Sequence, residues 1–258
     1  MSKKITSDQS FAGIGKKFSR NIYDTAKGKI RLAVLERDLQ DLIKAEKPLK
    51  VLDIGAGLGQ FSERLAAAGH QVVHTDIAAD MVEAAQARHQ ELQLSEQYHY
   101  YVAPLQELPQ LLQQQHYDLV LCHAVLEWLA DPESAIRLLK GFLKPEGTLS
   151  LMFYNRDAKI LANVIYGNFD YVEAGLEVKK KVRLSPQRPV APADVERWLQ
   201  DSELRINART GVRCFHDYLR NQDDQQRFEQ LLGLELKYNR QSPFNQIGRY
   251  LHWRIQHG

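Results

Sequence analysis

The stretch Val51-Leu-Asp-Ile-Gly-Ala-Gly-Leu-Gly-Gln60 decides the fold of this chain. It is a short apolar strand sequence, followed by glycines at 55, 57 and 59 and then by a segment with helical spacing. Glycine lets the backbone turn tightly after the strand and approach a ligand without a Cβ in the way. The helix that follows directs its N-terminus at that ligand. The stretch therefore predicts a ligand site at the carboxyl edge of a parallel sheet.

Strand and helix patterns alternate on both sides of this stretch. Strands are expected over 50–55, 72–75, 98–103, 117–122 and 148–154, with helices over 29–44, 60–68, 79–92 and 133–143. A helix over 192–200, strand material over 204–215, a helix over 223–238 and a last strand over 248–255 complete the pattern. Such alternation indicates βαβ units with right-handed crossovers. We expect an α/β fold with a Rossmann-like seven-stranded, mostly parallel sheet, helices on both faces and an antiparallel last strand.

The length of 258 residues and the composition bound the organisation. We expect a single domain over 1–258, with an N-terminal helical cap over about 1–47 and a basic insertion over about 156–190. No run of eighteen apolar residues predicts a membrane span, and the polar N-terminal stretch does not have the pattern of a secretory signal. Cys122 and Cys214 offer neither a disulfide framework nor a metal cluster. The expectation is a cytoplasmic protein without a metal or a membrane partner.

The glycine turn distinguishes between two cofactors. Its spacing is Gly-x-Gly-x-Gly, whereas the pyrophosphate fingerprint of nicotinamide enzymes needs a further glycine where Gln60 stands. Asp53, two residues before the first glycine, suits the cationic amino-acid end of S-adenosylmethionine. Asp76 ends the second strand, where a carboxylate can accept the ribose hydroxyl protons, although a helix N-cap is the alternative. We expect S-adenosylmethionine as the cofactor, and a nicotinamide-dependent oxidoreductase is the weaker alternative.

Further candidates follow the third and fourth strands. Gln106 and Glu107 would lie beside the adenine, unless they only begin a helix. His123 stands at the sheet's carboxyl edge, where ligands bind in open α/β folds. Cys122 lies in an apolar strand and is expected to be inert packing. The Asn/Asp-Pro-Pro-Tyr signature of amino-group methyltransferases does not occur at this place in the sequence, so methylation of an exocyclic base nitrogen is not expected.

Five segments, mostly outside the generic methyltransferase core, resemble those of one known family. They are Lys17-Phe-Ser-Arg-Asn-Ile-Tyr23, His123-Ala-Val-Leu-Glu-Trp128, Leu149-Ser-Leu-Met-Phe-Tyr-Asn155, Gly167-Asn-Phe-Asp-Tyr171 and Gly211-Val-Arg-Cys-Phe-His-Asp-Tyr218. Together they strongly resemble the bacterial tRNA 5-carboxymethoxyuridine methyltransferases, over nearly the whole chain. The resemblance implies that the carboxylate of the 5-oxyacetic acid group on the wobble uridine of tRNA becomes a methyl ester.

The resemblance also implies roles for single residues. Arg31 would pair with the methionine carboxylate of the cofactor. The full set of expected cofactor contacts is Arg31, Asp53, Gly55, Ala56, Gly57, Gly59, Asp76, Gln106, Glu107 and His123. A carboxylic acid is ionised at neutral pH, so no acid–base residue is expected. The candidates for orienting the substrate are Tyr23, Tyr154, Asn155, Arg213 and His216.

The insertion carries the expected RNA contacts. Cations bind phosphates and aromatic rings stack on splayed loop bases, so the predicted partner is the anticodon region of a tRNA. The candidate cations are Lys179, Lys180, Lys181, Arg183 and Arg188. A solvated loop is the alternative for this run. For the whole chain, a methyltransferase of a small molecule, such as a quinone or a free carboxylic acid, and a non-catalytic cofactor-binding protein stay open, and the sequence does not indicate an oligomeric state.

Overall fold

The computed structural model describes residues 8, 25–113, 115–177 and 188–258. One seven-stranded sheet has the order β3-β2-β1-β4-β5-β7-β6. Its strands are β1 (Lys50–Ile54), β2 (Gln71–Asp76), β3 (Tyr98–Val102), β4 (Tyr117–His123), β5 (Leu143–Tyr154), β6 (Leu204–Val212) and β7 (Tyr250–His257). β7 is antiparallel to both β5 and β6, and the pairs from β3 through β5 are parallel. The predicted fold class is confirmed.

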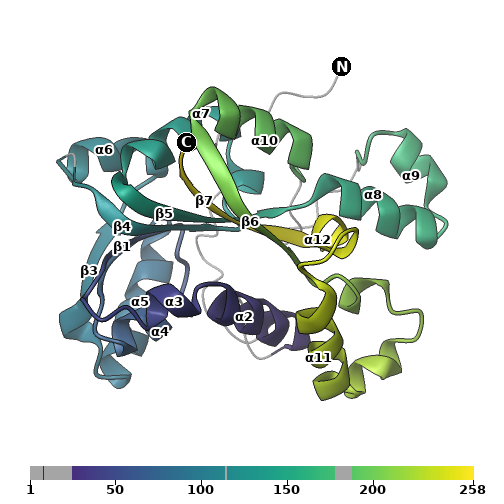
Figure 1. Cartoon of the computed structure of the whole chain (residues 1–258), viewed down its shortest axis with the longest axis horizontal. Coiled ribbons are helices and arrows are strands. Elements are labelled where there is room, and N and C mark those ends of the chain that lie inside the picture. The colour runs from purple at the N-terminus through teal and green to yellow at the C-terminus, as the bar shows by residue number, and fades with distance from the viewer. Residues whose placement is uncertain (1–7, 9–24, 114, 178–187) are drawn as a thin grey trace.

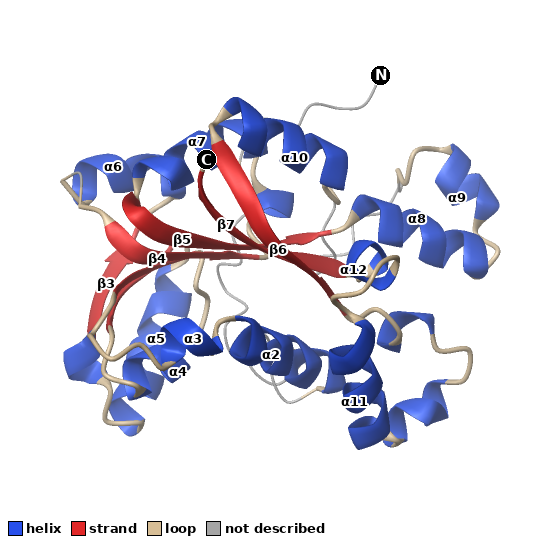
Figure 2. Ribbon diagram, in the orientation of Figure 1, coloured by secondary structure: helices blue, strands red, loops and turns tan. Residues whose placement is uncertain are grey.

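Helices cover both faces of the sheet (Figures 1 and 2). One face carries α2 (Ala26–Asp38), α3 (Gln40–Ile43), α4 (Ser62–Ala67), α5 (Ala79–Glu91) and α11 (Phe228–Tyr238). The other face carries α6 (Leu108–Leu111), α7 (Pro132–Gly141) and α10 (Pro192–Asp201). Beyond the sheet extend α8 (Arg156–Ile165) and α9 (Phe169–Glu173), with α12 (Phe244–Ile247) beside α8. Short 3-10 turns are η1 (Ser95–Gln97), η2 (Leu105–Glu107), η3 (Leu126–Trp128), η4 (His216–Tyr218) and η5 (Gln222–Gln226).

The central strands are apolar throughout because both of their faces are buried. Successive side chains of a strand point to opposite faces, so Leu52 and Val120 join the core under α7 and α10. Val51 and Leu119 pack on the other face against Leu39 and its neighbours. This double burial fixes the register and holds the strand ends at one edge of the sheet.

The structure differs from the sequence expectations at several boundaries. The strand expected over 148–154 begins earlier, at Leu143, which already pairs with Tyr117 before a register shift. In the described residues 156–177 lie α8 and α9, and Asn155 starts α8 by accepting a hydrogen bond from Asp157 N at 3.0 Å. The helix expected over 29–44 is divided into α2 and α3, and that over 223–238 into η5 and α11.

The described part of the chain holds no helix long and apolar enough to cross a membrane.

Candidate active site

The glycine turn after β1 has the backbone conformation that the sequence predicts. Gly55, Gly57 and Gly59 have φ values of +61°, +58° and +70°. A Cβ at Gly55 would lie 2.6 Å from Cγ2 of Val125, so a larger residue would collide there. Ala56 N donates to Thr75 O at 3.0 Å, which ties the turn to the end of β2.

Asp76, at the end of β2, holds this turn from the other side. Its Oδ2 accepts from Gly57 N and its Oδ1 from Ala78 N, both at 2.9 Å. Burial raises the pKa of Asp76 although both of these bonds oppose the rise. Each carboxylate oxygen keeps a further lone pair for a hydroxyl donor. Asp76 is not the helix N-cap that the sequence offered as an alternative, because Ala78 is the N-cap of α5; the Asp76 carboxylate instead binds the turn and lines the pocket wall.

Asp53 lies beneath the same turn and is 6% exposed. Burial raises its pKa to about 7, the hydrogen bond with Ser62 opposes this rise, and the charge of Asp76 adds to it. A cation bound nearby would favour the ionised form of Asp53.

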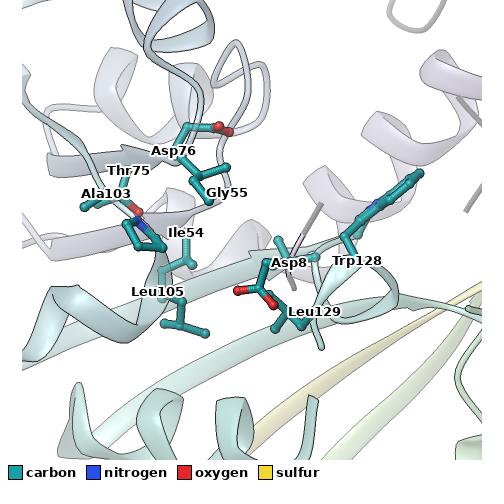
Figure 3. Close-up of a pocket in the computed structure, with 13 residues that line it drawn as sticks. Asp8, Ile54, Gly55, Thr75, Asp76, Ala103, Leu105, Trp128 and Leu129 are labelled. Atoms are coloured by element: carbon teal, nitrogen blue, oxygen red, sulfur yellow. The ribbon is translucent and has the colours of Figure 1, made fainter. Parts of the chain in front are cut away.

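One pocket opens at the ends of β1, β2 and β3. Figure 3 shows Asp76 and Gly55 on one side and Trp128 on the other. The complete lining is Asp8, Ile54, Gly55, Thr75, Asp76, Ile77, Ala103, Pro104, Leu105, Ala124, Val125, Trp128 and Leu129. Most of this wall is apolar, with a few polar groups at fixed places, as in pockets that hold small ligands.

Asp8 is a pocket residue that the sequence did not reveal. Its Oδ2 accepts from Gln106 Nε2 at 2.9 Å, and its Oδ1 accepts from Ala130 N at 2.7 Å. Arg188 donates to Ala130 O at 3.0 Å, so this candidate RNA contact lies near the pocket rim. Glu107 is exposed and is not among the lining residues. Asp8 and Gln106 are 98 residues apart in the chain, so no local sequence pattern could relate them.

His123 is the last residue of β4, and the buried Glu127 follows it in η3. Burial is the main cause that holds the pKa of His123 well below its usual range, and its neighbours His252 and Arg31 add to the effect. Burial raises the pKa of Glu127 to about 8, while backbone bonds and Arg31 oppose the rise. Glu127 Oε2 accepts from Tyr154 N at 3.4 Å, and Oε1 has no hydrogen-bond partner in the described residues.

A second group of side chains lies beside this point, at the ends of β5 and β7. We call it the cation–tyrosine cluster: Tyr154, Lys159, Arg213, Arg249 and Tyr250. The two tyrosines are cross-strand partners with ring centroids 5.3 Å apart. Arg249 lies over Tyr154 at 5.1 Å, and Arg213 over Tyr250 at 5.3 Å. Lys159 Nζ lies 5.8 Å from the Tyr154 ring centroid.

The cluster contains more cations than its neighbouring acids can balance. Asp217 Oδ2 pairs with Arg213 Nε at 3.0 Å. Burial alone would raise the pKa of Asp217, but His216, Arg213 and Arg249 lower it below its ordinary value. Arg213 has a left-handed φ of +61°, a conformation that costs energy in a residue other than glycine. The three cations outnumber the two nearby acids, Asp217 and Glu127, so the cluster is positive.

The other substrate-orienting candidates have different surroundings. Asn155 is fully buried and donates to Gln246 O at 2.8 Å and Gly248 O at 3.1 Å, so backbone groups occupy its amide. His216 is 2% exposed, and neither ring nitrogen has a hydrogen-bond partner among the described residues. Outside the described residues lie Tyr23, Lys179, Lys180, Lys181 and Arg183.

Sequence reasoning missed Asp8, Glu127, Lys159, Arg249 and Tyr250. Only Glu127 had a signal, because it belongs to the segment that resembles the known family. Burial raises the pKa of Cys122, which agrees with packing and not with a reactive thiol. Within the described ranges, no group of three His, Cys, Asp or Glu residues is arranged to hold a metal ion.

Comparison with known proteins supports a methyltransferase site. Residues 52–151 match a family model described as a methyltransferase domain. The chain is 44% identical over 248 residues to the tRNA 5-carboxymethoxyuridine methyltransferase of Escherichia coli (strain K12), covering 95% of each chain. It is 32% identical over 169 residues to the ubiquinone biosynthesis O-methyltransferase of Xanthomonas campestris pv. campestris (strain B100), covering 63% of this chain and 65% of the relative.

A solved structure repeats the fold. Magnesium protoporphyrin IX methyltransferase from Synechocystis PCC 6803 with bound S-adenosylhomocysteine (SAH) superposes with a TM-score of 0.60. The match covers 78% of this chain and 89% of that one at 23% identity. At this identity the likeness is one of fold.

Proposed function

This chain belongs to the tRNA 5-carboxymethoxyuridine methyltransferase family of S-adenosylmethionine-dependent enzymes, and from that premise we propose that it methylates the carboxylate of 5-carboxymethoxyuridine at the tRNA wobble position. The product is the methyl ester. The cation–tyrosine cluster beside the pocket is the observation that supports this proposal best.

The chemistry of the cluster suits the proposed substrate. A carboxymethoxyuridine presents an anionic carboxylate and a flat base, and the cluster offers guanidinium groups and tyrosine rings. A guanidinium can hold a carboxylate with two parallel hydrogen bonds. Arg213 and Arg249 therefore take the carboxylate in this proposal, with Tyr154 at the base. Asn155 and His216 remain candidates that support them from the buried side.

The residues around the pocket also suit the cofactor. Gly55 leaves the space that a Cβ would fill, and the buried Asp76 can accept from ribose hydroxyls. We propose that Gly55, Ala56, Gly57 and Gly59 pass along the cofactor and that Asp53 lies toward its cationic end. In the same proposal Gln106 and Glu107 lie beside the adenine, and Arg31 and His123 beside the amino acid. S-adenosylmethionine supplies a methyl group on a sulfonium, which is a good leaving group.

The protein's own part in the reaction is positioning. The acceptor carboxylate is ionised at neutral pH, so it needs no general base. Arg213 and Arg249 orient it, and the buried walls around Glu127 and Tyr154 exclude water from it. Holding two reactants in line can contribute roughly 7–11 kcal/mol in favourable cases.

The tRNA is proposed to dock over α8, α9 and the basic run. Tyr166 and Phe169 are 55% and 59% exposed, which leaves rings available for stacking. Arg188 lies near the pocket rim, and Lys179, Lys180, Lys181 and Arg183 would add phosphate contacts. The anticodon region is the part of the tRNA that carries the acceptor. A tRNA substrate also assigns the chain to the cytoplasm in this proposal.

A small-molecule acceptor is the second candidate, because the relative from X. campestris is named for ubiquinone biosynthesis. Under that alternative the basic run is a solvated surface. Affinity for tRNA that falls steeply with salt concentration would favour the RNA substrate.

The decisive test is mass spectrometry of nucleosides from tRNA lacking the methyl ester, incubated with the protein and labelled S-adenosylmethionine. We expect one labelled methyl on 5-carboxymethoxyuridine, lost with Asp76→Ala and kept with Glu83→Ala on the exposed side of α5. No transfer, with normal cofactor binding by calorimetry, would remove the tRNA assignment and favour the small-molecule acceptor.

A further inference from the structure

A chain of hydrogen bonds leads from His123 into the protein. His123 Nε2 lies 2.8 Å from Ser150 Oγ, and Ser150 Oγ lies 2.8 Å from His252 Nε2. His252 Nδ1 in turn lies 2.8 Å from Asp38 Oδ2. We call these four residues the buried chain. They come from β4, β5, β7 and the last residue of α2, which are far apart in the sequence and adjacent in the fold (Figure 2).

All three strand residues point to the face of the sheet that α2 covers. His123 and His252 are both register partners of Met152, and Ser150 is two residues before Met152 on the same strand. Ser150, His252 and Asp38 are 0%, 1% and 3% exposed. His123 is the member that is partly exposed. It immediately precedes Ala124 and Val125, which line the cofactor pocket.

The charges at Asp38 fix the direction of the first hydrogen bond. Arg37 and Arg240 each donate to Asp38 Oδ1 at 2.7 Å. Burial would raise the pKa of Asp38, but His252, Thr210 and Arg37 hold it well below the usual range. An ionised carboxylate only accepts, so His252 Nδ1 must donate to it. Arg254 donates to the backbone O of Asp38, and its own charge is paired with Asp41.

The direction of this first hydrogen bond determines which atom carries the proton in each of the other bonds of the buried chain. Two arginines already exceed the charge of Asp38, so a neutral His252 avoids adding a third cation to this buried place. Its Nε2 is then an acceptor and takes the hydroxyl proton of Ser150. Ser150 Oγ accepts from Nε2–H of His123. His123 is itself kept neutral by burial, as its lowered pKa indicates. Its Nδ1 is left as a bare acceptor, because the bond of the ring to a described residue is made by Nε2.

We propose that Asp38, His252 and Ser150 are positioning residues that hold His123 in the Nε2–H tautomer, so that its Nδ1 accepts a hydrogen bond from the α-ammonium group of the cofactor. The inference rests on the proposed function only in taking His123 as a cofactor contact. A bare ring nitrogen can bind only a donor, and the ammonium is the donor at the amino-acid end. Arg31 takes the carboxylate at that end. It lies seven residues before Asp38, two turns away on the same face of α2.

The first measurement is the tautomer of His123, read from the imidazole ¹⁵N shifts of the wild-type protein. We expect Nε2–H and a bare Nδ1. In Ser150→Ala the link to His252 is lost, and both tautomers should become populated. The binding probes are SAH, which has the ammonium, and 5′-methylthioadenosine, which lacks the whole amino acid. Ser150→Ala should weaken SAH binding about tenfold and leave methylthioadenosine binding unchanged.

Thr148→Val is the matched control, because Thr148 lies on the same strand and face as Ser150 but outside the buried chain. It should change neither the tautomer nor either affinity. A wild-type His123 protonated at Nδ1 would overturn the inference. So would equal weakening of both probes in Ser150→Ala, since that indicates general structural damage, or no weakening of either. None of these outcomes depends on tRNA, so failure of the proposed substrate would be seen separately, as absent methyl transfer with normal SAH binding.

Discussion

The cofactor pocket and the cation–tyrosine cluster lie at the same edge of one sheet but are built in opposite ways. The pocket is formed mainly by backbone turns and strand ends within about half of the chain, and Asp53 and Asp76, two of the acids at or near it, are buried. The cluster is formed by side chains of β5, α8 and the segments around β7, and its charge is positive.

Because of this difference, the pocket and the cluster suit different chemical groups of the ligands. Acids and bare backbone groups suit the ribose hydroxyls and the cationic amino-acid end of S-adenosylmethionine. Guanidinium and ammonium groups suit a carboxylate or phosphate. Damage to the pocket should therefore reduce cofactor binding, and damage to the cluster should reduce use of the acceptor while cofactor binding is kept.

The largest effect is expected for Gly55→Ala. The new Cβ would lie 2.6 Å from Val125 Cγ2, at a backbone φ of +61° that alanine disfavours. We expect SAH binding, measured by calorimetry, to weaken about 100-fold, or about 2.7 kcal/mol. Gly69→Ala is the control, because its φ is +91° but its Cβ would meet nothing within 4 Å. Equal loss of SAH binding in both variants would show that backbone strain alone, and not the shape of the pocket, governs the affinity.

The second effect concerns acid and the buried His74 on β2. Burial first, and then His89, lower the pKa of His74 from 6.5 to about 3. The unfolded chain therefore binds this proton more readily, and stability is lost as the pH falls below 6.5, until about pH 3. At pH 5 the loss is about 2 kcal/mol, at roughly 1.4 kcal/mol per pH unit. In His74→Phe, chemical denaturation at pH 7 and 5 should show a correspondingly smaller decrease.

The control for this pH effect is His99→Phe, on the neighbouring strand, where the side chain is exposed. It should leave the pH dependence of unfolding as in the wild type. If His74→Phe loses stability with acid as steeply as the wild type does, protonation of His74 is not the cause of the loss of stability at low pH.

The same two regions differ in how far the sequence alone could predict them. The glycine turn, Asp53 and Asp76 are local patterns, because strand, turn and helix follow one another along the chain. The cluster depends on β7 inserting between β5 and β6, which sets Tyr250 opposite Tyr154. No spacing in the sequence relates residues about a hundred positions apart. Arg213 and Tyr154 were named from family resemblance or from a strand end, while Lys159, Arg249 and Tyr250 required the fold.

Side-chain hydrogen bonds were the least predictable feature. The sequence identified Asn155 as a candidate for the substrate, yet its amide donates to two backbone carbonyls. Likewise, Asp38 looks like an ordinary helix-end residue, and only the packing of α2 on the sheet brings it to His252. Such partners are chosen by tertiary contacts that local propensity does not encode.

A tenfold effect is expected for Arg249→Ala in the cluster. Arg249 lies over the Tyr154 ring at 5.1 Å, and its loss removes one guanidinium from the proposed carboxylate site. We expect kcat/KM for tRNA to fall about tenfold, while SAH affinity changes less than about twofold. Arg249→Lys should recover only part of the activity, because lysine lacks the planar fork.

Arg205→Ala is the matched control for Arg249, because Arg205 is exposed on the edge strand β6 and bonds only to Asn207 among described side chains. It should leave both constants unchanged. A loss of SAH affinity in Arg249→Ala would contradict the separation of the two regions, because it would make the cluster part of the cofactor site.

The smallest effect distinguishes two kinds of cation. Lys159 is 7% exposed and lies 5.8 Å and 5.6 Å from the ring centroids of Tyr154 and Tyr171, so it is held against tyrosine rings and cannot reach out to phosphate. Lys159→Met should lower kcat/KM for tRNA about threefold and leave the salt dependence of tRNA binding unchanged.

The exposed Arg188 is the contrast to Lys159. If it contacts phosphate, Arg188→Gln should reduce the slope of log affinity against log salt by about 0.9. A change of slope with Lys159→Met would instead show that Lys159 also contacts phosphate. The cluster would then be part of one continuous phosphate-binding surface and not a separate site for the substrate carboxylate.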